Sequence, residues 1–264
     1  MTYYNNKVIW ITGASSGIGK ALALYLSQFE CRLILSARRE QELNLVKAEC
    51  QNPNNVRVIP FDLGDLDKMK DVTTAAISSF GKVDILVNNG GISQRSALIE
   101  TSIEVDKKLM AIDYLGTVAL SKAILPHFME NNNGHYVVVT SLMGRFSSPY
   151  RSAYCGAKHA LHGFFNSLRL EHDKDHIKVT LICPGFVNTN VARNALTGDG
   201  STQGHQDEKT EQGLDVDVFA KKMAKAVKKQ KFEAYIGGFE RIGVLVSRIS
   251  PKLIHFMVKN MKVR

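Results

Sequence analysis

The chain has 264 residues and a net charge of +9, with 44% hydrophobic and 22% charged residues, which is the composition of a globular protein and excludes a disordered or fibrous chain. The first six residues are polar and aromatic, so we expect neither a signal peptide nor an N-terminal anchor there. Four scattered cysteines favour free thiols in a reducing compartment over a disulfide framework or a metal site. These features predict a cytoplasmic protein with no bound metal.

The positive charge is concentrated at the carboxyl end. Residues 221–264 carry twelve Lys and Arg against two acids, a net charge of +10. Such a surface can attract an anionic membrane, an acidic carrier protein or nucleic acid, although a solvated basic face is the commoner explanation. Nucleic acid is not expected as a partner, because no recognition helix, RNA-binding motif or zinc spacing accompanies the charge.

The chain begins with a strand, a glycine turn and a helix. An apolar run at 7–11 leads into Thr12-Gly13-Ala14-Ser15-Ser16-Gly17-Ile18-Gly19, and an apolar-periodic helix continues to residue 29. Glycines let a phosphate approach the backbone closely, and the amides at the start of the helix can hold it. The flanking elements favour a cofactor site over a purely structural turn.

The second strand, at 31–36, is followed by Ala37-Arg38-Arg39. Dinucleotide folds that prefer NAD place an acid near this point, whereas an arginine suits the 2′-phosphate of NADP. We therefore expect NADP(H) in preference to NAD(H), with Arg38 as the first contact and Arg39 as the second. The alternative is that both arginines simply begin the solvated helix at 39–51.

The remaining strands alternate with helices. We predict strands at 56–61, 83–87, 135–140, 177–183 and 232–236, and helices near 66–80, 104–130, 153–172 and 215–230. Near-continuous apolar strands in this order indicate an α/β fold with a parallel sheet of about seven strands and helices on both faces. A single domain over 1–264 is the simplest organisation. The polar loop at 186–213 is either a substrate lid or an uncommitted surface insertion.

A tyrosine and a lysine carry the chemistry. Tyr154 and Lys158 lie four apart in the helix predicted at 153–172, so they share one face. A nearby ammonium lowers the pKa of a phenol from its usual value of about 10 and suits it to move a proton beside a carbonyl. Ser141 ends the apolar strand at 135–140, at the edge of the sheet where α/β folds bind ligands.

Six motifs in order resemble the short-chain dehydrogenase/reductase family, in its single-domain NAD(P)-dependent branch. They are Thr12-Gly13-x-x-x-Gly17-Ile18-Gly19, Asp62-Leu63, Asn88-Asn89-Gly90-Gly91, Ser141, Tyr154-x-x-x-Lys158 and Pro184-Gly185-x-x-x-Thr189. The segments 151–154 and 198–201 resemble the group of dehydrogenase/reductase member seven. The resemblance implies a Rossmann-type doubly wound sheet and an enzyme that acts on CH–OH groups.

The resemblance also implies roles for residues. Tyr154 would be the general acid or base, Lys158 would lower its pKa and hold the nicotinamide ribose, and Ser141 would orient the substrate oxygen. The implied cofactor-binding residues are Thr12, Gly13, Ser15, Ser16, Gly17, Ile18, Gly19, Arg38, Arg39, Asp62, Leu63, Asn89, Gly91, Tyr154, Lys158, Pro184, Gly185, Val187 and Thr189.

Two positions depart from the family pattern. Gly90 stands where the family usually has Ala, and Asp113 stands where it commonly has an Asn that holds a water in the proton relay. An aspartate has nearly the same shape as asparagine but can be charged. Unless Asp113 is protonated or turned away, we expect its carboxylate to pair with Lys158, raise the pKa of Tyr154 and move oxidation to higher pH than is usual for the family.

The resulting prediction is an NADP(H)-dependent oxidoreductase that interconverts a ketone or other carbonyl and a secondary alcohol. The alternatives are a 3-oxoacyl carrier-protein reductase and, in a different class, a non-catalytic NADP-sensing or membrane-surface protein. The basic, amphipathic extension at 239–264 is too short and too charged to span a bilayer. It either packs on the domain or a second subunit, or makes weak contact with a membrane surface. By resemblance we expect a homodimer or homotetramer.

Overall fold

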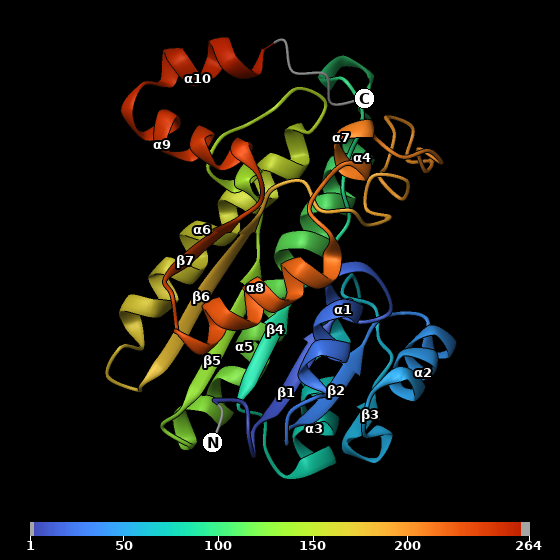
Figure 1. The fold of residues 1–264 in the computed structure, drawn as a ribbon, viewed down its shortest axis with the longest axis vertical. Helices are drawn as coiled ribbons and strands as arrows, with labels where there is room; N and C mark the ends of the chain where they lie inside the picture. Colours follow the sequence, from blue (N-terminus) through green and yellow to red (C-terminus); the bar gives the residue numbers. More distant parts are fainter. Residues whose placement is uncertain (1–2, 260–264) are drawn as a thin grey trace.

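Seven parallel strands form one sheet in the order β3-β2-β1-β4-β5-β6-β7 (Figure 1). This computed structural model describes residues 3–259. The strands are β1 (Val8–Thr12), β2 (Arg32–Ser36), β3 (Val56–Val58), β4 (Ile85–Asn88), β5 (Gly134–Val139), β6 (Ile177–Pro184) and β7 (Glu233–Ile236). The α/β class and the seven-stranded doubly wound sheet predicted from the sequence are confirmed.

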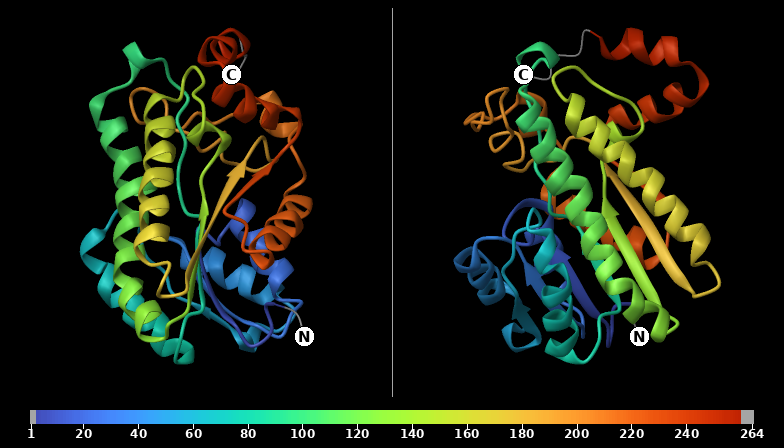
Figure 2. Two further views of the ribbon diagram at one scale, coloured as in Figure 1. Left: turned by 90° about the vertical axis from the view of Figure 1, so that its left-hand side faces the viewer. Right: turned by 180° about the vertical axis from the view of Figure 1, so that it is seen from behind.

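Each face of the sheet is covered by helices, because both sets of alternating side chains along a strand are apolar. In β1, Ile9 and Ile11 face one core, whereas Val8 and Trp10 face the other. The first core is completed by α1 (Gly17–Leu26), α2 (Glu40–Glu49) and α8 (Val216–Lys228). The second is completed by α3 (Met69–Phe80), α5 (Thr117–Glu130) and α6 (Ser152–Glu171), which lie in front of the sheet when the molecule is seen from behind (Figure 2).

The strand order creates a switch point between β1 and β4. The chain runs from β1 through β2 to β3 on one side, and then returns to place β4 on the other side of β1. Connections that leave in opposite directions open a crevice at the carboxyl ends of these strands, where α/β folds bind their ligands.

Two predicted elements differ in detail. The third strand ends at Val58 instead of residue 61, although the N–H groups of Ile59 and Phe61 still donate to the carbonyl oxygens of Leu35 and Ala37. The helix predicted at 104–130 is α4 (Ile103–Leu109), a π-helical turn η4 (Met110–Gly116) and α5. By length and composition the stretch 103–130 could cross a membrane, a property that buried core helices share; here α5 packs on α3, and η4 packs on α6.

Short helices complete the described residues. They are η1 (Pro53–Asn55), η2 (Leu66–Lys68), η3 (Leu98–Glu100), η5 (Leu142–Gly144), α7 (Glu208–Glu211), η6 (Phe239–Arg241), α9 (Ile242–Ile249) and α10 (Pro251–Val258). The lid segment 186–213 is a loop with one short helix, as predicted.

The last two helices pack on the domain through one face. Val244 and Val258 are buried in a small core with Met143 and Phe146. The opposite face leaves apolar side chains exposed: Phe239, Ile242, Leu245, Ile249, Leu253, Phe256 and Met257. One face of residues 239–259 therefore packs on the domain. Residues 260–264, including Lys262, lie outside the described residues.

Candidate active site

A cavity of about 640 Å³ lies over the carboxyl ends of the strands. It is bordered by the glycine turn, by the end of β2, and by Ser141, Tyr154 and Lys158. Of the site residues predicted from the sequence, all but Gly19 and Asp113 line it. Both exceptions lie directly behind the wall.

In the glycine turn, backbone segments approach so closely that a side chain would not fit between them. Gly13 and Gly17 have φ of +63° and +52°, and a Cβ on Gly13 would lie 2.7 Å from the Cα of Gly90. A Cβ on Gly19 would lie 2.3 Å from the carbonyl oxygen of Gly13, so Gly19 lets α1 pack against the turn. Gly17 and Ile18, the first residues of α1, line the cavity, so the start of this helix is placed to bind the pyrophosphate of a dinucleotide.

Asn89 braces this turn. Its Nδ2 donates to the carbonyl oxygens of Thr12 and Gly13 at 2.9 and 3.3 Å, and its backbone N–H donates to Thr12 Oγ1 at 3.0 Å. Asn89 also lines the cavity. Its contacts give it a structural role in addition to the cofactor-binding role that the resemblance implies.

Arg38 and Arg39 border the cavity just after β2 and are both exposed. In residues 3–259, neither side chain forms an ion pair with a carboxylate. Two uncommitted guanidinium groups at this end of the cavity are suited to a phosphate.

The three residues proposed for proton transfer come from two elements. Tyr154 and Lys158 lie in the first two turns of α6, and Ser141 follows β5 and caps η5, its Oγ accepting the N–H of Met143 at 3.1 Å. The buried Gln94 fixes the start of α6, because its Oε1 accepts the N–H groups of Ala153 and Tyr154 at 3.0 and 3.5 Å. The tyrosine is therefore held by backbone contacts, and its side chain reaches the cavity.

Lys158 and Asp113 form a buried ion pair. Lys158 Nζ lies 3.1 Å from Asp113 Oδ2, 3.5 Å from the carbonyl oxygen of Val139 and 5.5 Å from the centre of the Tyr154 ring. Asp113 Oδ1 accepts the N–H of Ile92 at 2.7 Å. Burial raises the pKa of Asp113, against the opposing effects of Lys158 and the Ile92 N–H. Burial lowers the pKa of Lys158, but the Asp113 carboxylate and Tyr154 outweigh it and raise that pKa overall. The expected Asp113–Lys158 pairing is confirmed.

The position of Asp113 depends on the π-helical turn. Asp113 lies in the middle of η4, between α4 and α5. The wider turn carries its fully buried carboxylate between Lys158 and Gly91, where a Cβ on Gly91 would lie 3.1 Å from Asp113 Oδ1. Single π turns inside α-helices are frequent at functional sites.

The lid segment 186–213 is joined to the wall formed by residues 93–102. Leu196 and Gln94 form a parallel bridge, Arg95 donates its N–H to the Leu196 carbonyl at 2.8 Å, and Ser102 donates to Gly198 at 2.9 Å. A side-chain contact adds to these: Arg95 Nε lies 2.7 Å from Asp207 Oδ2, and both residues are buried. Residues 186–213 are therefore held against this side of the cavity.

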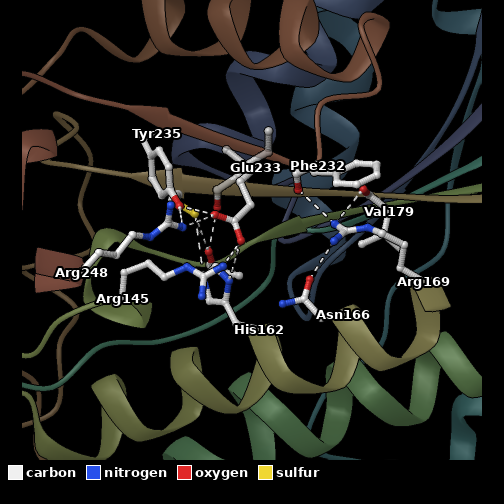
Figure 3. Close-up of polar contacts among 12 residues, drawn as sticks. Arg145, His162, Asn166, Arg169, Val179, Phe232, Glu233, Tyr235 and Arg248 are labelled. Atoms are coloured by element: carbon white, nitrogen blue, oxygen red, sulfur yellow. Dashed lines mark hydrogen bonds and ion pairs between the residues drawn. The ribbon is translucent and has the colours of Figure 1, made fainter. Parts of the chain in front are cut away.

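A second polar cluster is centred on Glu233 and contacts Arg145, in the segment that follows Ser141 (Figure 3). Glu233 of β7 pairs with Arg145 and accepts the Tyr235 hydroxyl, and Arg248 of α9 lies 3.4 Å from Glu233 Oε2. His162 lies 3.9 Å from the same carboxylate, but burial and the nearby Arg145 lower its pKa to about 3, so it is neutral. The cluster connects β7, α6 and α9 with Arg145 in the segment that follows Ser141.

Four residues of this site were not singled out for these roles in the sequence. Gln94, Arg95, Arg151 and Asp207 are buried polar side chains around the cavity. Arg95 and Asp207 are separated by 112 positions, so no local pattern links them. Four consecutive polar residues at 93–96, which follow a strand end, are a signal in the sequence for the first two of these residues.

Comparisons with known proteins agree with this geometry. Residues 7–200 match the family model described as "short chain dehydrogenase". The chain is 36% identical over 264 residues to "Dehydrogenase/reductase SDR family protein 7-like" of Drosophila melanogaster, covering 98% of this chain and 81% of that protein. It is 48% identical over 198 residues to the human "Dehydrogenase/reductase SDR family member 7", covering 73% of this chain and 58% of the relative.

Solved structures share the fold. A short-chain dehydrogenase/reductase from Burkholderia phymatum in complex with NAD superposes with a TM-score of 0.83 at 21% identity, covering 100% of this chain and 99% of that one. An alcohol dehydrogenase from Thermococcus sibiricus complexed with 5-hydroxy-NADP has a TM-score of 0.74 at 26% identity, covering 89% and 97%. The two neighbours thus hold different nicotinamide cofactors on a similar sheet.

Proposed function

The chain belongs to the short-chain dehydrogenase/reductase family, in the group of dehydrogenase/reductase members 7 and 7B, and from this premise we propose that it interconverts a ketone and a secondary alcohol with NADP(H). As a member of this family it is an NAD(P)-dependent oxidoreductase. The observation that carries the finer proposal is the placement of Ser141, Tyr154 and Lys158 on one cavity with the glycine turn.

The proton chemistry follows from these three side chains. In reduction, the Tyr154 hydroxyl gives its proton to the substrate oxygen while the Ser141 hydroxyl donates a hydrogen bond to the same oxygen. In oxidation, Tyr154 takes that proton back. A nicotinamide cofactor, when bound, supplies or accepts the hydride at the carbonyl carbon. Lys158, whose ammonium lies 5.5 Å from the Tyr154 ring, stabilises the negative charge that forms on the phenol oxygen.

The preference for NADP(H) rests on Arg38 and Arg39. Both are exposed at the cavity, and in the part of the chain described by the structure neither is paired with an acid. A 2′-phosphate placed there would gain charge-assisted hydrogen bonds that the 2′-hydroxyl of NAD cannot match.

The deciding experiment is a turnover screen of NADPH and NADH against ketones, aldehydes and carrier-bound 3-oxoacyl substrates, with Tyr154→Phe as the comparison. We expect Tyr154→Phe to lower the rate by about 10²- to 10⁴-fold, the usual contribution of a positioned acid or base, and to leave cofactor binding intact. Cofactor binding with no Tyr154-dependent turnover would contradict the proposal. A cytoplasmic location, and a homodimer or homotetramer as the assembled form, belong to the same proposal; fractionation and light scattering test them.

A further inference from the structure

Arg151 is a buried cation on the wall of the cavity, three residues before Tyr154. It is 6% exposed and precedes the first residue of α6. Its Nε is buried without a hydrogen-bond partner, and within residues 3–259 no acceptor bonds to any nitrogen of its guanidinium. A guanidinium has five N–H donors, and buried donors are normally satisfied. Arg151 therefore lines the cavity with a guanidinium that donates no hydrogen bond to any of the described residues.

The nearest carboxylate is already bound to another arginine. Asp207 Oδ2 lies 2.7 Å from both Nε and a terminal nitrogen of Arg95, whereas Arg151 is 3.8 Å away. Asp207 Oδ1 accepts from Gln203 Nε2 at 2.9 Å. Two buried guanidinium groups thus share one carboxylate, which leaves one positive charge without a close counterion.

That charge persists at neutral pH. Burial, and then the neighbouring Arg95, lower the pKa of Arg151 to about 10, with Tyr154 and Asp207 opposing, so the group remains protonated. Glu240 also borders the cavity, but its Oε1 accepts the N–H groups of Phe186 and Gly238 at 3.0 and 2.9 Å. The Phe186 ring, 6.0 Å from the guanidinium carbon, shields one side of Arg151.

We propose that Arg151 binds a carboxylate of the substrate, so that the natural substrates are oxo acids and their hydroxy-acid counterparts. A single uncompensated charge matches a carboxylate better than a phosphate, which carries about −1.5 to −2 at neutral pH. The planar guanidinium binds a carboxylate through two parallel hydrogen bonds. Because Arg151 lies one helical turn from Tyr154, a substrate held at one end by Arg151 presents its carbonyl to the tyrosine at the other. This inference rests on the proposed carbonyl–alcohol reaction and adds the substrate class.

The test measures the wild-type enzyme with NADPH on pairs of substrates, each an oxo acid and its methyl ester. The panel includes both aryl and alkyl oxo acids. We expect kcat/KM to be higher for the acid by about 10- to 100-fold, the range for hydrogen bonds to a charged group. Arg151→Gln should remove this preference. We expect it to lower kcat/KM for the acid and to leave kcat/KM for the ester within about threefold of the wild-type value, since the ester gains little from a charged partner. Arg193→Gln, an exposed arginine of the lid outside the cavity wall, is the matched control and should keep the preference.

Equal loss for acid and ester in Arg151→Gln, or a wild-type preference for the ester, would overturn the inference. Tyr154-dependent turnover of the ester would then still support the proposed reaction, so the two failures are distinguishable. Calorimetry of benzoate binding to the NADP-bound protein gives a readout besides turnover. We expect binding that Arg151→Gln abolishes and Arg193→Gln retains; no binding to the wild type would count against the carboxylate subsite.

Discussion

Lys158 Nζ and Asp113 Oδ2 lie 3.1 Å apart, and both residues are buried. The lysine charge near Tyr154 is therefore shared with the carboxylate of Asp113. A carboxylate this close offsets part of the positive potential at the phenol. The pair also links the π-helical turn η4 to α6, so the chemistry of Tyr154 depends on two helices that are distant in sequence.

Asp113→Asn should shift the pH dependence of alcohol oxidation. Asparagine keeps an acceptor for the Ile92 N–H but removes the negative charge, so the whole Lys158 charge acts on Tyr154. We expect the pH of half-maximal oxidation to fall by about one unit, at the lower end of shifts caused by a nearby charge. Rate profiles from pH 5 to 10 measure it, with Asp106→Asn in α4 as the control. An unchanged midpoint in Asp113→Asn would refute the role of the carboxylate.

Arg38→Ser should weaken the use of NADPH selectively. Loss of one charge-assisted contact to the 2′-phosphate is expected to lower kcat/KM for NADPH by about 10-fold or more, with NADH changed less than about twofold. Arg32→Ser removes the same charge from the opposite end of β2, where Arg32 lies over the Phe80 ring, and should leave the cofactor ratio unchanged. Parallel loss with both cofactors in Arg38→Ser would argue against a phosphate contact.

His135 should make folding sensitive to acid. It is buried in β5 between Tyr3 Oη at 2.9 Å and Thr180 Oγ1 at 2.8 Å, and burial with the nearby Lys7 and Lys178 lowers its pKa to about 3. In the unfolded chain its pKa is about 6.5, so between those values the unfolded state binds the extra proton and stability falls as pH decreases. We expect His135 to lower the free energy of unfolding at pH 5 by about 2 kcal/mol relative to pH 7.

Urea unfolding at pH 7 and pH 5 measures this effect. His135→Gln should reduce the difference in the free energy of unfolding between the two pH values. His205→Gln, in an exposed part of the lid, should leave that difference as it is in the wild type. The same loss of stability in the wild type and in His135→Gln would assign the acid sensitivity to other groups, of which neutral His162 is the first candidate.

Glu233→Gln should loosen the support behind Ser141. The change removes the charge that pairs with Arg145 and Arg248 and leaves Arg145 partly buried without its partner (Figure 3). We expect a loss of about 2 kcal/mol in the free energy of unfolding, below the 3–5 kcal/mol of a fully buried pair because the cluster is partly exposed. Glu171→Gln, exposed at the end of α6, is the control. A loss of no more than that of the control would show that the cluster is not stabilising.

The sequence by itself determined the parallel sheet, its helices on both faces, the glycine turn and the Tyr154–Lys158 pair. These features depend on local periodicity and short spacings, which the chain carries wherever it folds. The strand edge at which Ser141 lies followed from the same alternation. Asp113 was also identified from one position in a motif, and its pairing with Lys158 was expected.

Only the tertiary structure decided what surrounds the substrate. Arg95 and Asp207 lie in two loops and are separated by 112 positions in the sequence. Gln94 accepts the N–H of Ala153 at the start of α6, which is 59 positions away. Within residues 3–259, the carboxylate nearest to Arg151 is that of Asp207 at 3.8 Å, and Arg95 binds it at 2.7 Å. Long-range polar contacts depend on how loops close over a cavity, and loop closure has no periodic signal in the sequence. The charge around the cavity therefore depends on tertiary contacts that the sequence pattern does not predict.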